Sequence, residues 1–238
     1  MARYQERAPR PELAGPVTCV WTHESASGHE QRIIPDGCVD LIWIGGRLEL
    51  AGPDSGPRLV DLPPGTAAGG VRMRPGAAGL LLGATPTSEL LDDQVPLPEV
   101  WGSRATGLLD RLHATTTAPE SALVLEDLAL RLLPRFARDP AIDAAVAALA
   151  GLRPPPVPGL ADALGLSERQ LRRRFTAAVG YGPKTLAAVL RLRRALRLGA
   201  GGGLADLAAA AGYADQAHMT REFRRLAGLP PAALLSSW

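Results

Sequence analysis

The C-terminal third of the chain repeats one pattern of apolar and polar positions. In each copy, a segment rich in alanine and leucine leads through a glycine into a second segment whose apolar residues recur at helical spacing. The copies span residues 160–175 and 204–225, and Ser167 and Asp215 stand where each could cap the second segment. Glycine supplies the backbone freedom that a tight turn between two helices needs. The repeat therefore predicts two helix-turn-helix units.

The second segment of each copy has an apolar side and a polar side. Leu171 and Phe175 belong to the apolar side of the first, and Met219 and Phe223 to that of the second. The polar sides are rich in arginine, which, like glutamine, can form paired hydrogen bonds with base edges in the major groove. A merely solvated arginine face is the alternative for one helix, but two copies with matching polarity favour DNA contact. The polar residues are Arg169, Arg172, Arg173 and Thr176, then Gln216, Ala217, Thr220, Arg221 and Arg224.

The N-terminal part of the chain has a β-type pattern instead. Short runs rich in Val, Ile and Trp are separated by Gly and Pro, and Gly45-Gly46 is placed for a tight hairpin turn. We expect a small β-sheet or a barrel-like domain. The strand candidates are residues 17–21, 31–34, 38–44 and 48–50.

Leucines at helical spacing return after Thr87. Residues 100–113 and 120–137 carry such leucines, which could cover the sheet or form a dimer interface, core packing being the commoner outcome. A further helix is expected from Pro140. The proline-rich residues 151–158 indicate a stiff linker, where we place a domain boundary.

Together these patterns predict an α+β chain: a β-rich, barrel-like N-terminal domain with covering helices, and an all-α C-terminal domain of two helix-turn-helix units. The expected organisation is a loose N-terminal arm over residues 1–16, a β-rich sensing domain over 17–98, a helical covering or dimerisation segment over 99–152, and the double helix-turn-helix domain over 153–238.

Charge is distributed unevenly along the chain. The net charge is only +2, but residues 153–238 hold thirteen basic and five acidic side chains, a net of +8. The rest of the chain therefore carries a net of −6. A basic region beside an acidic one indicates nucleic acid as a partner of the basic region. A GC-rich genome could explain the preference for arginine over lysine as well as function does.

Other classes of function find little support in the sequence. The N-terminus lacks the apolar stretch of a signal peptide and no run is long enough to cross a membrane, so we expect a cytoplasmic location and no membrane partner. The histidines and cysteines lack metal-ligand spacing, and no catalytic constellation is evident. We expect no enzyme activity, no metal and no cofactor. Cys38 lies between two aspartates, which would raise the pKa of its thiol and so disfavour a reactive thiolate.

The repeated motif resembles a known family. Ser-x-Arg-x-Leu-x-Arg-x-Phe from Ser167, followed by Gly180-Tyr-Gly-Pro, is similar to the first half of an AraC-type DNA-binding domain. Gly212-Tyr-Ala-Asp-Gln-Ala-His-Met-Thr-Arg-Glu-Phe, followed by Gly228-Leu-Pro, is similar to the second half. The resemblance implies that a long helix, here residues 183–198, joins two units whose second helices enter successive major-groove segments. The glycine-rich residues 199–203 would then link that helix to the second unit.

The resemblance also implies roles for particular residues. Carried over by position, the base-contacting residues fall on Arg169, Arg172 and Arg173, then on Gln216, Thr220 and Arg221, while Ala217 departs from the polar residue of some members.

The N-terminal patch Pro35-Asp-Gly-Cys-Val-Asp-Leu-Ile-Trp43 and the segment from Gly70 to Ala78 resemble the N-terminal domain of an AraC-type subgroup. This implies a transcription regulator that binds double-stranded DNA under control of a small-molecule effector, with RNA polymerase and a second copy of the chain as further expected partners. Trp21, Cys38 and Trp43 are the candidate ligand-binding residues. The alternative is a ligand-independent DNA-binding protein whose N-terminal domain recruits a protein partner.

Overall fold

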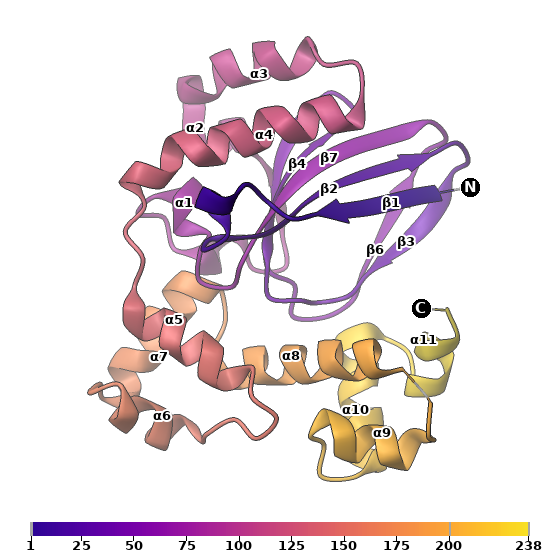
Figure 1. Ribbon diagram of the computed structural model, residues 1–238, viewed down its shortest axis with the longest axis vertical. Coiled ribbons are helices and arrows are strands. Elements are labelled where there is room, and N and C mark those ends of the chain that lie inside the picture. The colour runs from indigo at the N-terminus through magenta and orange to yellow at the C-terminus, as the bar shows by residue number, and fades with distance from the viewer. Residues whose placement is uncertain (1, 200, 238) are drawn as a thin grey trace.

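The structure is a computed structural model that describes residues 2–199 and 201–237. Its N-terminal half contains a six-stranded antiparallel sheet in the order β1-β2-β7-β4-β5-β8, and β3 pairs with β6 in a separate two-stranded ribbon (Figure 1). The strands are β1 (Ala2–Arg7), β2 (Val17–Ser25), β3 (His29–Ile33), β4 (Val39–Ile44), β5 (Arg47–Ala51), β6 (Arg58–Leu62), β7 (Thr66–Met73) and β8 (Gln94–Pro96).

Apart from α1, the α-helices follow the strands in the chain, and those of the C-terminal half lie below the sheet in Figure 1. The α-helices are α1 (Gly79–Leu82), α2 (Leu97–Trp101), α3 (Thr106–His113), α4 (Ala118–Leu132), α5 (Pro140–Leu149), α6 (Val157–Ala163), α7 (Glu168–Val179), α8 (Pro183–Leu198), α9 (Leu204–Ala211), α10 (Gln216–Ala227) and α11 (Pro231–Ser237). Short 3₁₀ helices are η1 (Pro11–Leu13), η2 (Thr87–Leu90), η3 (Gly102–Ala105) and η4 (Leu133–Arg135).

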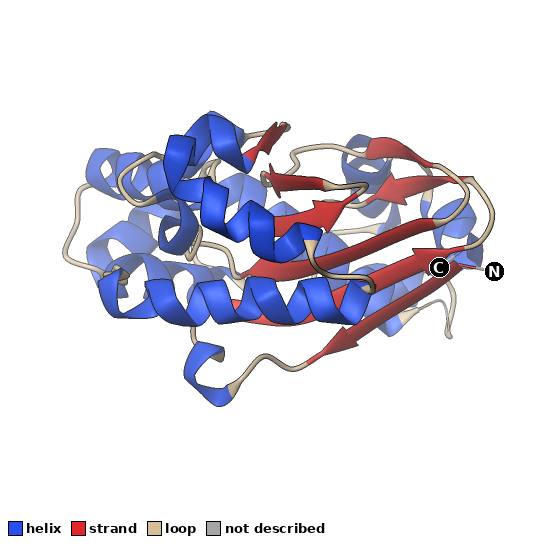
Figure 2. Cartoon of the chain, turned by 90° about the horizontal axis from the view of Figure 1, so that it is seen from above, coloured by secondary structure: helices blue, strands red, loops and turns tan. Residues whose placement is uncertain are grey.

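One face of the sheet is covered by α4, which runs along the strands when the molecule is seen from above (Figure 2). Alternate strand residues such as Leu41 and Val71 point to this face and are fully buried, as the two-residue period of a strand requires. Gly69 allows α4 to approach, because a Cβ there would lie 2.7 Å from the Ala118 carbonyl oxygen. The sheet and α4 thus enclose the main N-terminal core.

The leucines that could have formed a dimer interface belong to this core. Leu108 and Leu112 of α3 and Leu125 and Leu128 of α4 are all buried against the sheet. Core packing, the commoner of the two predicted outcomes, is therefore confirmed for these four positions.

The prediction of a loose N-terminal arm was wrong for the part of it that the structure describes. Residues 2–7 form the edge strand β1, and the fully buried Leu13 packs into the core. The buried Glu126 carboxylate of α4 accepts hydrogen bonds from the Arg7 guanidinium, the shorter at 2.7 Å, and from the Arg10 backbone N–H at 2.8 Å. Burial alone would raise the pKa of Glu126, but these contacts hold it below its usual value. The charges that suggested a solvated arm are instead used in docking it.

The C-terminal helices form a second core that crosses both predicted units. It includes Phe175 of α7, Val189 and Leu192 of α8, and Phe223 of α10, all of them fully buried. α5, which the sequence placed with the covering segment, belongs to this core as well, since its Ile142 side chain is buried in it. The proline-rich segment before α6 therefore connects helices of one core, because α5, which precedes it, packs against the helices that follow.

Across the described residues, 2–199 and 201–237, no helix is both long enough and apolar enough to cross a membrane.

Candidate nucleic-acid interface and ligand cavity

The first helix-turn-helix unit consists of α6 and α7. The Ser167 side chain accepts a hydrogen bond from the Gln170 backbone N–H while the Gln170 side chain accepts one from that of Ser167, which fixes where α7 begins. Gly180 ends the helix in the left-handed region, with φ of 97°. Leu171 and Phe175 are fully buried, so the opposite face of α7 is turned to solvent.

That solvent face carries the arginines predicted to contact DNA. Arg169, Arg172 and Arg173 are all exposed, and Arg172 lies 3.4 Å from the Glu168 carboxylate one turn earlier, a weak surface pair. Arg174 has a different role, since its guanidinium forms hydrogen bonds of 2.6–3.0 Å with both oxygens of Asp139, the residue that caps α5. The three predicted arginines therefore remain available to a partner, while the fourth joins α7 to α5.

The second unit, α9 and α10, presents a similar face. The Asp215 carboxylate caps α10 by accepting the His218 backbone N–H at 2.6 Å. Gln216 and Arg221 are exposed, whereas Thr220 is half-buried and donates its hydroxyl to the Gln216 carbonyl oxygen at 2.9 Å. Of the predicted contacts on α10, Gln216 and Arg221 are thus the most accessible.

Two arginines of α8 fasten the second unit. Arg191 donates two hydrogen bonds of 2.9 and 3.1 Å to Glu222 of α10, and its guanidinium lies 5.1 Å from the centre of the Tyr213 ring. Arg194 donates to the Ala211 carbonyl oxygen at 3.0 Å and to two carbonyl oxygens at the end of α5. Such contacts oppose independent motion of the second unit, although the glycine run 199–203 links it to α8. Ala200 of that run lies outside the described residues.

The hydrogen bonds of Arg194, which join α8 to α9 and to the end of α5, give this residue a structural role. Hydrogen bonds from a charged donor contribute roughly 1.5–3 kcal/mol. We therefore expect Arg194→Met to lower the free energy of unfolding by about 2 kcal/mol, measured by urea denaturation. Arg197→Met, at an exposed position one turn on, is the matched control and should change it by less than about 0.5 kcal/mol. Equal, small effects from both substitutions would show that the Arg194 contacts carry no stability.

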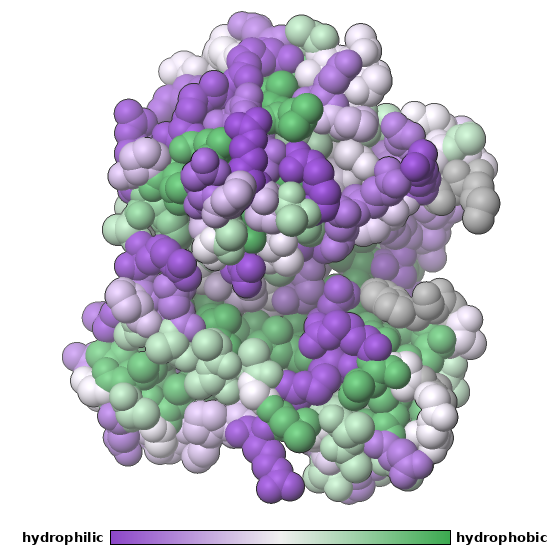
Figure 3. Space-filling view, in the orientation of Figure 1, coloured by the Kyte–Doolittle hydropathy of each residue, from purple (hydrophilic) through white to green (hydrophobic). Residues whose placement is uncertain are grey.

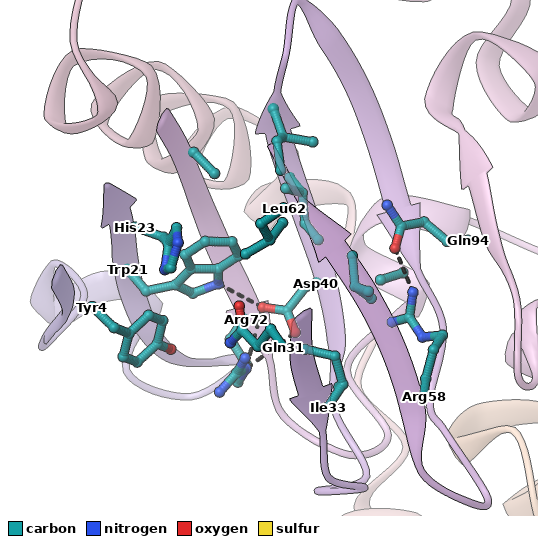
Figure 4. Close-up of a pocket in the computed structure, with 15 residues that line it drawn as sticks. Tyr4, Trp21, His23, Gln31, Ile33, Asp40, Arg58, Leu62, Arg72 and Gln94 are labelled. Atoms are coloured by element: carbon teal, nitrogen blue, oxygen red, sulfur yellow. Dashed lines mark hydrogen bonds and ion pairs between the residues drawn. The ribbon is translucent and has the colours of Figure 1, made fainter. Parts of the chain in front are cut away.

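A cavity of about 120 Å³ lies on the other face of the sheet, beneath the β3–β6 ribbon (Figure 4). We call it the sheet–ribbon cavity. A Cβ at Gly70 of β7 would overlap the Trp21 indole, so glycine there lets the ring lie against the strand. The cavity is lined by Tyr4, Trp21, His23, Gln31, Ile33, Asp40, Ile42, Ile44, Ala51, Arg58, Val60, Leu62, Ala68, Arg72 and Gln94.

One end of the cavity holds an ion-pair cluster. The Asp40 carboxylate accepts hydrogen bonds from the Trp21 Nε1–H at 2.7 Å and from the Arg72 guanidinium at 3.1 Å. Arg72 also lies within 3.5 Å of Asp36 and Glu6. Burial raises the pKa of Asp40, and the positive charge of Arg72 opposes that shift. At the other end, Arg58 pairs with Asp54 at 3.2 Å and, as Figure 4 shows, with Gln94.

His23 stands out among the polar residues that line the cavity. The residue has a relative exposure of only 5%, yet neither Nδ1 nor Nε2 has a hydrogen-bond partner. Burial, and then the nearby His29, lower the pKa of His23, which favours the neutral form of its ring. A buried donor or acceptor without a partner is destabilising by about 1–3 kcal/mol. A bound molecule that satisfied this ring would recover part of that free energy.

Of the three ligand candidates from the sequence, only Trp21 lines the cavity. Trp43 points to the other face of the sheet, where its ring lies 5.0 Å from that of His113. Cys38 is buried outside the cavity lining, and burial followed by the charge of Asp36 raises the pKa of its thiol. Both effects act in the direction expected from the sequence. His23 was missed, although its place two residues after Trp21 on one strand face was a usable signal.

The ribbon that roofs the cavity also contacts the second unit. On β3, Gln31 and Ile33 line the cavity, and Arg32 between them points outward and donates to the Ala227 carbonyl oxygen at the end of α10, at 3.3 Å. Pro57, next to β6, lies against Gly228, since a Cβ on Gly228 would be 3.2 Å from the Cγ of Pro57. The same two strands thus form part of the cavity wall and hold the end of α10.

A second contact joins the two halves at the first unit. The buried Thr87 hydroxyl of η2 donates to the Ala178 carbonyl oxygen of α7 at 3.0 Å.

Figure 3 shows the hydrophilic residues in the middle of the lower half of the molecule, between more apolar surfaces on either side. Within the described part of the chain, no group of three or more acidic, histidine or cysteine side chains is arranged to hold a metal ion.

Comparison with known proteins agrees with this division of the chain. Residues 160–237 match the family model of a helix-turn-helix domain, and residues 5–96 match that of a domain of unknown function (DUF6597). No curated protein matches the chain in sequence.

Solved structures of similar arrangement include those of ToxT from Vibrio cholerae. A 1.65 Å structure of ToxT is 10% identical, with a TM-score of 0.48 over 98% of each chain. A structure of ToxT with a bound unsaturated fatty acid is 11% identical, with a TM-score of 0.48 over 91% of this chain and 94% of that one.

Proposed function

We propose that the chain is an AraC-type helix-turn-helix transcription regulator, in which α7 and α10 contact base edges of its operator under the control of a small molecule held in the sheet–ribbon cavity. The helix-turn-helix domain at residues 160–237 supports DNA-binding transcription regulation. The observation that carries the assignment of contacts is the exposure of Arg172 and Arg221 on two helices packed into one core.

Arg172 and Arg221 are the residues whose replacement best tests this assignment. Replacing a base-contacting arginine with alanine should cost about 1–3 kcal/mol and relax specificity at one base pair. We expect Arg172→Ala to relax one half-site and Arg221→Ala the other, measured by selecting bound DNA from a random pool with each full-length variant. Arg131→Ala, at an exposed position of α4, is the charge-matched control and should leave the selected sequence unchanged.

Equal losses of affinity for all DNA sequences would show that these arginines contact only phosphates. The affinity of the full chain should also fall steeply with added salt, because each neutralised phosphate releases a counterion. A salt-independent affinity would contradict duplex DNA as the partner.

The cavity favours the ligand-controlled regulator over the alternative that recruits a protein partner. A sensor needs a concave site with an apolar wall and a few polar groups, and the sheet–ribbon cavity combines apolar side chains with His23, Asp40 and Arg58. A partner-recruiting domain would instead present a large apolar patch over a solid core. Contacts with RNA polymerase and with a second copy of the chain are part of the proposal for a regulator of this family.

The proposed route from the cavity to DNA is the β3–β6 ribbon. A molecule that moves the cavity wall at Gln31 and Ile33 also moves Arg32, which holds the end of α10. A ligand shifts an equilibrium only by its differential affinity for the two states. States that differ in whether the ribbon holds α10 would give the ligand that differential.

Arg32→Ala should loosen α10 without disturbing α7. A lost hydrogen bond of about 1 kcal/mol makes local opening roughly fivefold more frequent. We therefore expect the amides of residues 224–235 to exchange with solvent several-fold faster, while those of residues 168–179 keep their rates. Arg47→Ala, on the neighbouring β4–β5 hairpin, is the control. Unchanged exchange in residues 224–235 would contradict a hold on α10 by the ribbon.

A further inference from the structure

The size of the sheet–ribbon cavity limits what it can hold. Its volume is about 120 Å³, and an engineered apolar cavity of about 150 Å³ in another protein takes one benzene molecule. A single ring is therefore the largest group that the cavity encloses. The walls beside the Trp21 indole are largely aliphatic, formed by side chains that include Ile42, Val60 and Leu62.

Each charged side chain that lines the cavity is already paired with an opposite charge of the protein. Asp40 lies 3.1 Å from Arg72, and Arg58 lies 3.2 Å from Asp54. A carboxylate ligand would have to compete with Asp54 or Asp40 for these arginines, and a cation would have to compete with the arginines themselves. Bringing an uncompensated charge into such a site is costly, so the electrostatics favour a ligand without net charge.

His23 supplies the polar contact that such a ligand needs. Its neutral ring has one nitrogen that donates and one that accepts, and neither is used by the protein. In Figure 4 its ring lies beside the Trp21 indole on the same face of β2. Both nitrogens are closed to solvent in this structure, so a small amide, alcohol or phenol exchanges a hydrogen bond with His23 once the imidazole turns toward the cavity, while the ring of the ligand lies against apolar walls.

We propose that the sheet–ribbon cavity binds an uncharged, single-ring small molecule that hydrogen-bonds to His23. The proposal rests on the proposed control of the regulator by a small molecule, and it names the chemical class of that effector. His23 selects for a hydrogen-bonding substituent, and the paired charges select against acids and amines of the same shape.

The test compares three probes of nearly the same shape: benzamide, benzoate and benzamidinium. The full chain is labelled with ¹⁵N at its histidine side chains, and each probe is added up to about 10 mM, the range set by about −0.3 kcal/mol or better per non-hydrogen atom for a probe of this size. Benzamide should shift the His23 imidazole signals, and benzoate and benzamidinium should bind at least about tenfold more weakly. The signals of His113, on the other face of the sheet, should not move.

Two variants separate cavity binding from binding elsewhere, with saturation-transfer NMR on the probe as the readout. Ala68→Phe fills the cavity and should abolish benzamide binding. His23→Phe removes the hydrogen bond and should weaken it about fivefold, a typical value for one lost hydrogen bond. His113→Phe is the control and should leave the affinity unchanged. Binding that survives in Ala68→Phe, tighter binding of benzoate than of benzamide, or no shift of His23 with any probe would overturn the proposal.

Operator binding by the same protein, without probe, keeps the two proposals distinguishable. If none of the probes binds while the chain still binds its selected DNA, the proposed effector class is wrong and the proposal for DNA recognition is unaffected. If DNA binding fails while benzamide binds beside His23, the cavity assignment stands and the assignment of α7 and α10 falls.

Discussion

Arg72→Met should lower the free energy of unfolding by about 3 kcal/mol, because it leaves the Asp40 carboxylate without its cation. Removing one partner of a buried ion pair typically costs about 3–5 kcal/mol. The lower end applies, since the Arg72 side chain keeps 20% of its exposure. For a chain of this length, such a loss lowers the melting temperature by about 6–12 °C.

The loss of unfolding free energy in the Arg72→Met variant should depend on pH. Burial already raises the pKa of Asp40, and losing Arg72 raises it further, so the folded variant binds a proton more tightly than the unfolded chain does. The variant is therefore most destabilised at neutral pH, and the deficit shrinks as the pH falls through the raised pKa. The double variant Arg72→Met with Asp40→Asn should recover part of the stability, since the amide oxygen can still accept the Trp21 Nε1–H. A single variant as stable as the unsubstituted chain would contradict a structural role for this cluster.

The helical half of the fold could be predicted because its signals are local. Ser167 and Asp215 cap α7 and α10 as expected, and the expected joining helix runs over Pro183–Leu198. In an α-helix the periodicity, the cap and the terminating glycine all lie within a few residues of each other. Residues 160–237 of this half also match the family model of a helix-turn-helix domain.

The β-rich half could be predicted only in outline. The Gly45-Gly46 hairpin was found, with both residues at positive φ, but β1, β6, β7 and β8 were not predicted as strands. β1 has no β-branched residue, and β8 has only three residues and pairs with β5 far away in the sequence, so no local pattern marks either strand. β7 contains Gly69 and Gly70, which weaken a strand signal although the fold needs both.

The cavity could not be assembled from the sequence, because register creates it. Trp21, Asp40 and Arg72 come from three strands, and only the pairing of β7 with both β2 and β4 brings them together. The chemistry of Cys38 and Trp43 makes them ligand candidates, but the sequence does not show the face of the sheet to which each side chain points. A shift of one residue in a strand exchanges its two faces, so the assignment of cavity residues had to await the sheet.

Separating the two halves of the operator by 5 bp should remove most of the affinity. α8 has 16 residues, about 24 Å of helix, and both units pack against it within one core. Two helices held in this way should contact half-sites about 10 bp apart on one face of the duplex. Half a turn of added DNA puts those half-sites on opposite faces. The expected loss is about 2–5 kcal/mol, half of the roughly 4–10 kcal/mol that separates specific from non-specific binding.

The most direct measurement is the affinity of the full chain for its selected operator and for two matched derivatives of equal length. One derivative carries the 5 bp between the half-sites, and the other carries the same 5 bp outside them. Because Arg191 and Arg194 fasten the second unit to α8, the first derivative should bind about as weakly as an operator with one half-site scrambled, and the second should bind like the parent. Full-strength binding to the first derivative would contradict the account, since it would mean that α7 and α10 do not contact DNA as one rigid pair.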